Sequence, residues 1–320
     1  MSGRALRDLR FWLLGLALCG LVAALAGPRA TWSQPSYELL FVLDITGSMN
    51  ARDYQLEGRP VSRLTFVTHT LRQLLARLPC GSRMGLGVFT ERRSFLLFVP
   101  VEVCENFAPI DGALAGLSWR MAWEGDSRVA SGLHSAIAIA GELGADLVLL
   151  TDGQEAPPLP TTGPPAFEGE PGDVAGLIIG VGGETPVPIP KFDDRGREIG
   201  FVAAEDVPHE SRVGPPPADA SSREGWHPRN APFGAVPLVG TEHLTAVRAD
   251  HLQALARQTD LGFALLSDVS GLEEALRRDA APRQIETAVD LRALPAGLAL
   301  VALLAVYGVL PLLRFLRARR

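Results

Sequence analysis

The sequence predicts an α/β domain built on a doubly wound, mostly parallel β-sheet, with a hydrophobic segment at each end of the chain. Short apolar runs alternate with longer segments whose apolar residues recur at helical spacing. This alternation is typical of a parallel sheet that is covered by helices on both faces. A chain of 320 residues is long enough for one large domain or two small ones.

The predicted elements follow one another along residues 37–277. The apolar run at residues 37–43 indicates a buried strand, and residues 62–78 indicate a helix. Two strands at residues 84–89 and 94–99 flank a polar turn, so they form a hairpin that adds one antiparallel strand. Further helices are expected at residues 110–117, 129–143, 249–258 and 272–277, and further strands at residues 147–150, 177–181 and 263–266.

Proline and glycine mark the segments that interrupt this pattern. Residues 156–172 and 208–237 are rich in both, which predicts long surface loops. Between them, residues 188–202 predict a second hairpin with its turn at Asp193-Asp194-Arg195-Gly196. The glycines at 180, 182 and 183 lack the spacing of a nucleotide-binding loop, so we interpret them as the exit from a strand.

Two stretches without charged residues, at 11–28 and 293–313, are expected to cross a membrane. Each is close to the roughly 20 apolar residues that span a bilayer as a helix. Basic residues in segments 1–10 and 314–320 flank them, which places both ends on the cytoplasmic side and the domain at 37–280 on the outer side. A cleavable signal peptide is the alternative for the first stretch. Gly27-Pro28, directly after the small residues at 24 and 26, favours an anchor that is retained.

Charge and cysteine content narrow the kind of protein further. The net charge of −6, with no basic cluster in the central domain, argues against a nucleic-acid partner. Cys80 and Cys104 lie about equally far from the turn of the first hairpin, so they meet at its base. An oxidising compartment would allow them to form a disulfide. Cys19 is expected to be a small apolar residue of the first span.

Oxygen-bearing side chains are found where predicted strands end. Asp44, Thr46 and Ser48 follow the first strand, Asp152 follows the strand at 147–150, and Ser127 precedes the helix at 129–143. Because ligands of open α/β sheets bind at the carboxyl ends of the strands, these side chains should converge on one edge. Oxygen ligands without Cys or His suit Mg²⁺, Ca²⁺ or Mn²⁺ rather than zinc. The alternative is that these residues only cap helices.

This arrangement resembles the metal-ion-dependent adhesion site of von Willebrand factor type A domains. The similarity covers residues 37–276 and includes residues 251–256, which look like that family's last helix. It implies that Asp44, Thr46, Ser48, Ser127 and Asp152 hold the metal. Thr46 stands where Ser is usual, and Ser127 where Thr is usual; both keep the hydroxyl, although affinity and choice of metal can differ.

The resemblance implies a binding module that is not an enzyme. A metal held at the sheet edge would capture an acidic side chain of a periplasmic or membrane protein, beside the bacterial inner membrane. One alternative is a scaffold that binds through its loops and has a vestigial metal site. The other is a phosphoryl-transfer hydrolase, which requires a second Asp where this chain has Thr46.

A closer resemblance rests on residues 43–50 and on the layout with two anchors. It is to the MxaL-like accessory proteins of periplasmic methanol dehydrogenase, which are implicated in maturing that calcium-containing enzyme. The Bat-type group, linked to stress tolerance, has a similar layout and is the second candidate. The sequence does not identify the partner.

Overall fold

The computed structural model describes residues 8–121, 126–159, 163–207, 218–228 and 243–312, together with residues 216, 232–233, 241 and 316. The chain divides into two compact units, Pro35–Arg283 and a smaller unit formed by Met1–Gln34 with Gln284–Arg320. The larger unit contains the predicted domain at 37–280. Most of the predicted segments 1–10 and 314–320, and part of the predicted loop 208–237, lie outside the described residues.

Six strands form the central sheet of the larger unit, in the order β13-β8-β7-β2-β5-β6. All neighbours are parallel except β5 and β6, which form the predicted antiparallel hairpin. The strands are β2 (Glu38–Asp44), β5 (Arg83–Thr90), β6 (Arg93–Glu102), β7 (Asp146–Thr151), β8 (Gly176–Gly180) and β13 (Gly262–Leu265). The α/β class and the mostly parallel sheet are therefore confirmed.

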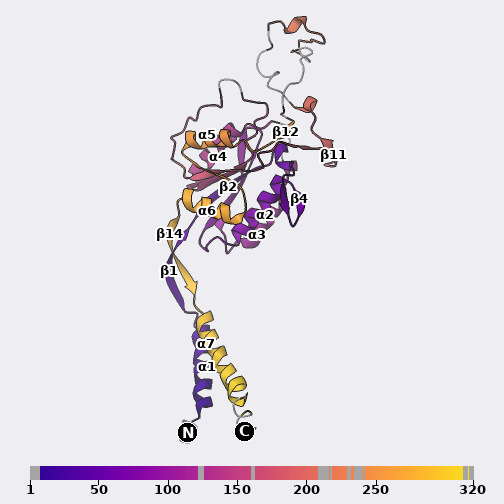
Figure 1. The fold of residues 1–320 in the computed structure, drawn as a ribbon. Helices are drawn as coiled ribbons and strands as arrows, with labels where there is room; N and C mark the ends of the chain where they lie inside the picture. Colours follow the sequence, from indigo (N-terminus) through magenta and orange to yellow (C-terminus); the bar gives the residue numbers. More distant parts are fainter. Residues whose placement is uncertain are drawn as a thin grey trace. The chain divides into compact units, whose positions relative to one another are not determined.

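Helices cover both faces of this sheet (Figure 1). Helices α2 (Arg63–Leu75), α3 (Phe107–Gly116) and α6 (Val269–Asp279) contribute to one apolar cluster, and α4 (Val129–Leu143) and α5 (Ala249–Thr259) to the other. Successive residues of β2 alternate between the two, since Phe41 packs in the first cluster and Val42 in the second. This double burial explains why the strand is apolar throughout rather than alternating.

Local signals in the sequence set the ends of several helices. The Ser62 side chain accepts a hydrogen bond from the Thr65 N–H and so caps the start of α2. Asp268 caps α6 by accepting from the Gly271 N–H. Helix α4 ends at Gly144, whose φ of 61° is the left-handed conformation that glycine adopts without strain.

Short paired strands and 3₁₀ turns lie outside the central sheet, and most were too short to be predicted. The pairs are β3 (Tyr54–Leu56) with β4 (Arg59–Val61), β9 (Val187–Pro188) with β12 (Leu244–Thr245), and β10 (Pro190–Phe192) with β11 (Glu198–Phe201). The last pair is the hairpin predicted at 188–202. The 3₁₀ turns are η2 (Gly47–Asn50), η3 (Trp119–Met121), η4 (Ala204–Asp206) and η6 (Ala220–Ser222).

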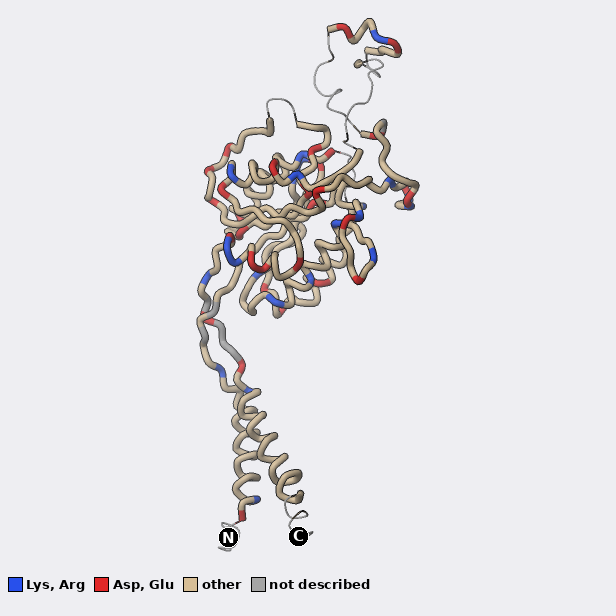
Figure 2. Tube along the Cα trace, viewed as in Figure 1, with Lys and Arg blue, Asp and Glu red and all other residues tan. Residues whose placement is uncertain are grey.

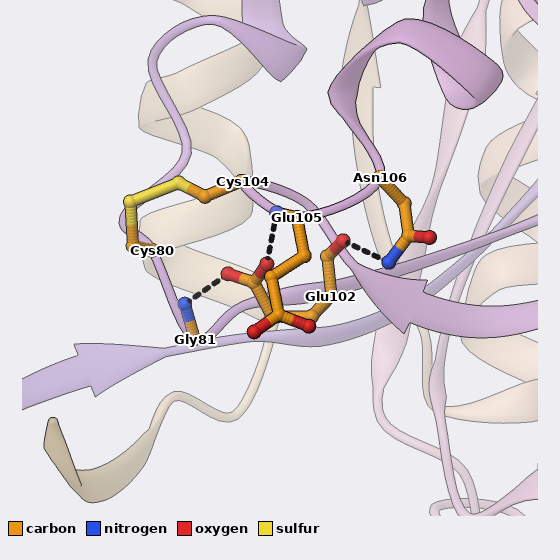
Figure 3. The surroundings of a disulfide bond; sticks show 6 residues. All are labelled: Cys80, Gly81, Glu102, Cys104, Glu105 and Asn106. Atoms are coloured by element: carbon orange, nitrogen blue, oxygen red, sulfur yellow. Dashed lines mark hydrogen bonds between the residues drawn. A yellow bond between two sulfur atoms is a disulfide. The ribbon is translucent and has the colours of Figure 1, made fainter.

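Cys80 and Cys104 form a disulfide at the base of the β5–β6 hairpin, where they were predicted to meet (Figure 3). Their Cα atoms are 5.3 Å apart. The neighbouring Glu102 carboxylate accepts hydrogen bonds from the backbone N–H groups of Gly81 and Glu105, at 2.6 and 2.5 Å. Burial would raise the pKa of Glu102, but these hydrogen bonds hold it below its ordinary value.

The smaller unit contains helix α1 (Leu9–Leu25) and helix α7 (Ala293–Leu304), which continues as a π-helical turn, η7 (Ala305–Val309). Ala17 packs with Ala299 and Ala302, and a Cβ at Gly20 would lie 2.8 Å from the Pro295 carbonyl oxygen. Small residues thus let the two helices approach closely, as in pairs of membrane helices. Strands β1 (Arg29–Ser36) and β14 (Arg283–Asp290) pair with each other.

One helical segment of the described residues, Ala293–Leu312, has the length and hydropathy of a membrane span, with a mean hydropathy of 2.3 over its best window. Helix α1 has 17 residues, a length of about 25 Å at 1.5 Å per residue, which is shorter than the roughly 30 Å hydrocarbon core. No charged residue interrupts either helix between Phe11 and Leu25 or between Ala293 and Leu304 (Figure 2). The first span therefore remains a prediction.

Candidate functional site

Two neighbouring strands bring the first and third predicted loops together. Strands β2 and β7 run parallel with Leu43 opposite Leu150, so Asp44 at the end of β2 lies beside Thr151 at the end of β7. The Asp44 carboxylate accepts a hydrogen bond from the Thr151 hydroxyl at 2.6 Å. Asp152 follows directly, and both aspartates are completely buried.

The loop after β2 folds back onto its own aspartate. One oxygen of Asp44, Oδ1, accepts hydrogen bonds from the Thr46 N–H at 2.8 Å and from the Thr46 hydroxyl at 2.7 Å. The Ser48 Oγ lies 3.4 Å from the Thr46 Oγ1. The turn η2 begins immediately after Thr46, and the Thr46 hydroxyl lies between the Asp44 carboxylate and the Ser48 hydroxyl.

Ser127 is attached to the same edge through the backbone. Its N–H and C=O exchange hydrogen bonds of 2.7 and 2.8 Å with Ala156, and it also forms a bridge with Glu91 at the tip of the β5–β6 hairpin. Its side chain is 4% exposed, and its Oγ is a buried atom without a hydrogen-bond partner among the described residues. A buried hydroxyl left in this way is costly unless another group uses it. The preceding Gly125 lies outside the described residues.

Two glycines allow this edge to close. A Cβ at Gly132 of α4 would lie 2.2 Å from the ring of Phe89 in β5, so only glycine lets the start of α4 approach the sheet this closely. Gly153, directly after Asp152, has a φ of 77°, and a Cβ there would lie 2.8 Å from Leu252. Both glycines therefore help to place the loops that carry Ser127 and Asp152.

Asp152 is bound to a buried arginine that the sequence analysis missed. Its Oδ2 accepts hydrogen bonds from Arg63 Nη1 at 2.7 Å and from the Thr245 hydroxyl at 3.1 Å, and its Oδ1 accepts one from the Gln154 N–H. Arg63 is also completely buried, at the first position of α2. Eighty-nine residues separate it from Asp152, so no local pattern could have revealed the pair.

Arg63 binds a second acidic residue on its other side. The Asp53 carboxylate accepts hydrogen bonds from Arg63 Nη2 at 2.6 Å and from the Gly183 N–H at 2.9 Å. Burial would raise the pKa of Asp53, but the hydrogen bonds and charge of Arg63 hold it below its ordinary value. The guanidinium therefore joins the loops after β2 and β7, and Asp53 joins the loop after β8 to them through the Gly183 N–H.

Asp44 has no such counter-ion among the residues that the structure describes. Complete burial, followed by repulsion from Asp152, raises its pKa from 3.8 to about 7, although hydrogen bonds from Thr151 and Thr46 oppose the shift. A cation bound next to Asp44 would relieve both effects.

The donor set fits a hard divalent cation. Each carboxylate has about four lone-pair positions. Asp44 uses three of these and Asp152 also three in the bonds described above, so one position remains on each. The hydroxyls of Ser48 and Ser127 retain free lone pairs. Magnesium is commonly bound by one or two carboxylates with water at other positions, which matches this set.

The described residues offer one other group that could hold a metal, Cys80, Glu102 and Cys104. The two sulfur atoms are bonded to each other, and both oxygens of Glu102 accept hydrogen bonds from backbone N–H groups (Figure 3). Thiolates, not disulfide sulfurs, are the usual metal ligands. The oxidised hairpin base is therefore a structural feature.

The pKa of Asp44 predicts a pH-dependent stability. Because the pKa is higher in the folded chain than in the unfolded one, this residue favours folding below about pH 4, and that contribution is lost as the pH rises towards 7. With divalent cations chelated, Asp44→Asn should raise the unfolding temperature at pH 8 but not at pH 4. A shift of about three pKa units corresponds to at most about 4 kcal/mol. Thermal unfolding of the full chain at both pH values measures this, and an equal effect at both would contradict it.

Removal of Arg63 should be strongly destabilising. Arg63→Met leaves Asp53 and Asp152 without their guanidinium, and breaking a buried pair from one side costs about 3–5 kcal/mol. The matched control is Arg72→Met on the same helix, because the ion pair of Arg72 with Asp111 is exposed. Thermal unfolding of both variants makes the comparison. A similar decrease in unfolding temperature in both variants would show that the buried ion pairs of Arg63 stabilise the fold no more than an exposed pair does.

Part of the chain matches a known family model. Residues 39–154 match the family model of the von Willebrand factor type A domain, a segment that includes Asp44, Ser127 and Asp152. None of the curated proteins matches the chain.

Several solved structures are similar. An aerotolerance-related membrane protein from Bacteroides fragilis is 16% identical, with 76% of this chain and 98% of that chain covered and a TM-score of 0.45. BatB from Bacteroides thetaiotaomicron is also 16% identical, with the same coverage and a TM-score of 0.46. A von Willebrand factor type A protein from Catenulispora acidiphila is 13% identical, with 76% and 42% covered and a TM-score of 0.39. The family match is thus to the von Willebrand factor type A domain, and it covers residues 39–154.

Proposed function

We propose that this chain is a membrane-anchored protein-binding module that captures an acidic side chain of its partner through a divalent cation. The observation that carries the proposal is the buried Ser127 Oγ, which has no hydrogen-bond partner among the described residues. It belongs to the same sheet edge as Asp44, whose buried carboxylate has no cationic partner in the described part of the chain. A cation coordinated by both would satisfy the hydroxyl and the carboxylate together.

The ligand set favours capture of a partner. Each aspartate has one free lone-pair position, so neither can chelate a cation through both of its oxygens. In addition, Arg63 offsets part of the negative charge on Asp152. Mg²⁺ bound here would therefore keep water at some positions. A carboxylate from another protein can replace one of these waters. It would add negative charge around the cation, to which this chain contributes two aspartates.

The surroundings of Ser127 support binding rather than catalysis. A nucleophilic serine needs an adjacent base, yet no described side chain forms a hydrogen bond with the Ser127 Oγ. The Nε2 atom of His251 lies 3.1 Å from the Glu155 carboxylate, so this imidazole is paired with Glu155 and not with Ser127. A hydrolase mechanism thus has no activated group at this edge among the described residues.

The segment Ala293–Leu312 supports membrane anchoring. We propose, from the basic flanks of both hydrophobic segments, that the domain faces the bacterial periplasm. The partner would be a periplasmic or membrane protein that the domain helps to assemble. Maturation of methanol dehydrogenase is one such role, and it rests on the resemblance at residues 43–50 alone.

Metal titration of the full chain, purified in detergent, tests the proposal. We expect Mg²⁺, Ca²⁺ or Mn²⁺ to bind with a heat signal in calorimetry, and Asp44→Ala or Asp152→Ala to abolish it. Ser127→Ala should weaken binding about tenfold, the equivalent of about 1.4 kcal/mol for one lost ligand. The matched control is Ser221→Ala, because Ser221 is exposed and lies outside the sheet edge.

Two results would contradict the proposal. One is metal binding that persists in Asp44→Ala, which would place the cation elsewhere. The other is a partner that binds equally well with the cation chelated, which would favour a scaffold that acts through its loops.

A further inference from the structure

A hollow of about 500 Å³ lies at the start of α4. Its lining includes two arginines from different elements, Arg92 in the turn between β5 and β6 and Arg128 at the N-cap of α4. Ser131, Glu155, Leu159 and Pro165 contribute to the rest of the wall. The hollow therefore combines a polar, cationic end with an apolar side.

This hollow adjoins the candidate metal site. Arg128 follows Ser127 in the chain, and its N–H donates a 2.6 Å hydrogen bond to the carbonyl of Glu91, the neighbour of Arg92. On the other side, Glu155 precedes Ala156, which exchanges two backbone hydrogen bonds with Ser127. The two arginines thus belong to the same loops as Ser127 and Glu91, so a ligand bound to a cation at Ser127 would lie beside the hollow that they line.

The guanidinium groups of Arg92 and Arg128 are available to bind a ligand. Arg128 makes no side-chain hydrogen bond or ion pair with any residue that the structure describes. Arg92 Nη2 lies 3.3 Å from Asp126 Oδ2, and Arg92 Nε lies 3.9 Å from Glu91 Oε1. Because the Arg92 side chain is 61% exposed, these ion pairs are weak. Guanidinium groups bind carboxylates through two parallel hydrogen bonds.

The acidic residue of the lining is already engaged. The Glu155 carboxylate accepts hydrogen bonds from the N–H groups of Val129 and Ala130 at the start of α4, and it also contacts His251. Its side chain is only 6% exposed. Its charge is therefore directed into the helix start and does not cancel the two arginines.

A second hollow of about 520 Å³ continues along α4 and shares Ser131 and Pro165 with the first. His134, Ile137 and Phe167 line it, and so do the acidic residues Glu168, Glu170 and Asp173. The second hollow is therefore apolar and acidic. Since like charges repel, we expect an acidic segment to bind in the first hollow, beside the two arginines, and not to extend along the second.

We propose that Arg92 and Arg128 bind a second carboxylate of the same partner segment whose first carboxylate completes the metal site. This inference rests on the proposed function and gives the partner a chemical description: a segment with at least two acidic side chains close together. The metal supplies the first attachment, and the arginines select segments with dense acidic charge over those with one acidic residue.

Two synthetic probes test this with the full chain in detergent, Mg²⁺ and about 0.15 M salt. One is an acetylated hexapeptide of glutamates, and the other a hexapeptide of glycines with one central glutamate. In the wild-type chain the hexaglutamate should bind more tightly. The double variant Arg92→Gln/Arg128→Gln should weaken hexaglutamate binding about tenfold and leave the single-glutamate peptide unchanged.

Controls separate charge from folding. Arg257→Gln removes an exposed arginine outside the hollow and should leave both affinities unchanged. Arg92→Lys/Arg128→Lys keeps the charges and should restore most of the hexaglutamate affinity. Mn²⁺ affinity equal to that of the wild type shows that the double glutamine variant keeps its metal site.

The outcomes distinguish this inference from the proposed function. If the double glutamine variant binds both peptides as the wild type does, the arginines are not part of the docking surface, although metal capture stands. If Asp44→Ala binds both peptides as the wild type does, metal capture is wrong. An arginine effect that is equally large for the single-glutamate peptide also overturns the inference, since it would reflect general attraction.

Discussion

The buried negative charge at the carboxyl edge of the sheet is the constraint on which the candidate site depends. Asp44 and Asp152 are both removed from water. This burial, followed by repulsion between the two carboxylates, raises the pKa of Asp44 to about 7. Buried charges of this kind persist where other groups compensate them. Within the described ranges, Arg63 pairs with Asp152 and Asp53, whereas Asp44 receives only hydroxyl and amide hydrogen bonds. The imbalance is what makes a cation at this edge physically favourable.

The fold provides this edge through neighbouring parallel strands. Because β2 and β7 are adjacent and in register, the residues that follow them meet without any long-range adjustment. The third loop comes from a different direction, and it depends on the close approach of α4 to β5 at Gly132. Arg63 then joins the loops from the other face, since it belongs to α2, which packs on the opposite side of the sheet from α4.

Much of this architecture could be predicted because it rests on local patterns. The apolar runs gave β2, β7, β8 and β13, and the hairpin geometry gave the Cys80–Cys104 disulfide. The helix at 129–143 was predicted with the bounds that the structure has. Of the predicted residues after β2, Thr46 contacts both Asp44 and Ser48. Metal binding by them stays a prediction.

What the sequence could not reveal depends on contacts between distant residues. Arg63 stands at the start of a helix among apolar residues, where an arginine is ordinarily exposed; only its partners, at positions 53, 152 and 245, explain its burial. The free hydroxyl of Ser127 is likewise a property of the assembled edge. Strands of two or three residues such as β9 and β12 carry no periodic signal.

A structure of the Mn²⁺-soaked protein with anomalous diffraction tests the central claim most directly. The account predicts one anomalous peak at the sheet edge, with the Ser127 and Ser48 hydroxyl oxygens about 2.1–2.3 Å from the metal. Asp44 and Asp152 would then coordinate through their remaining positions or through water. A peak elsewhere, or a Ser127 hydroxyl that stays without a ligand at saturating Mn²⁺, would contradict the account.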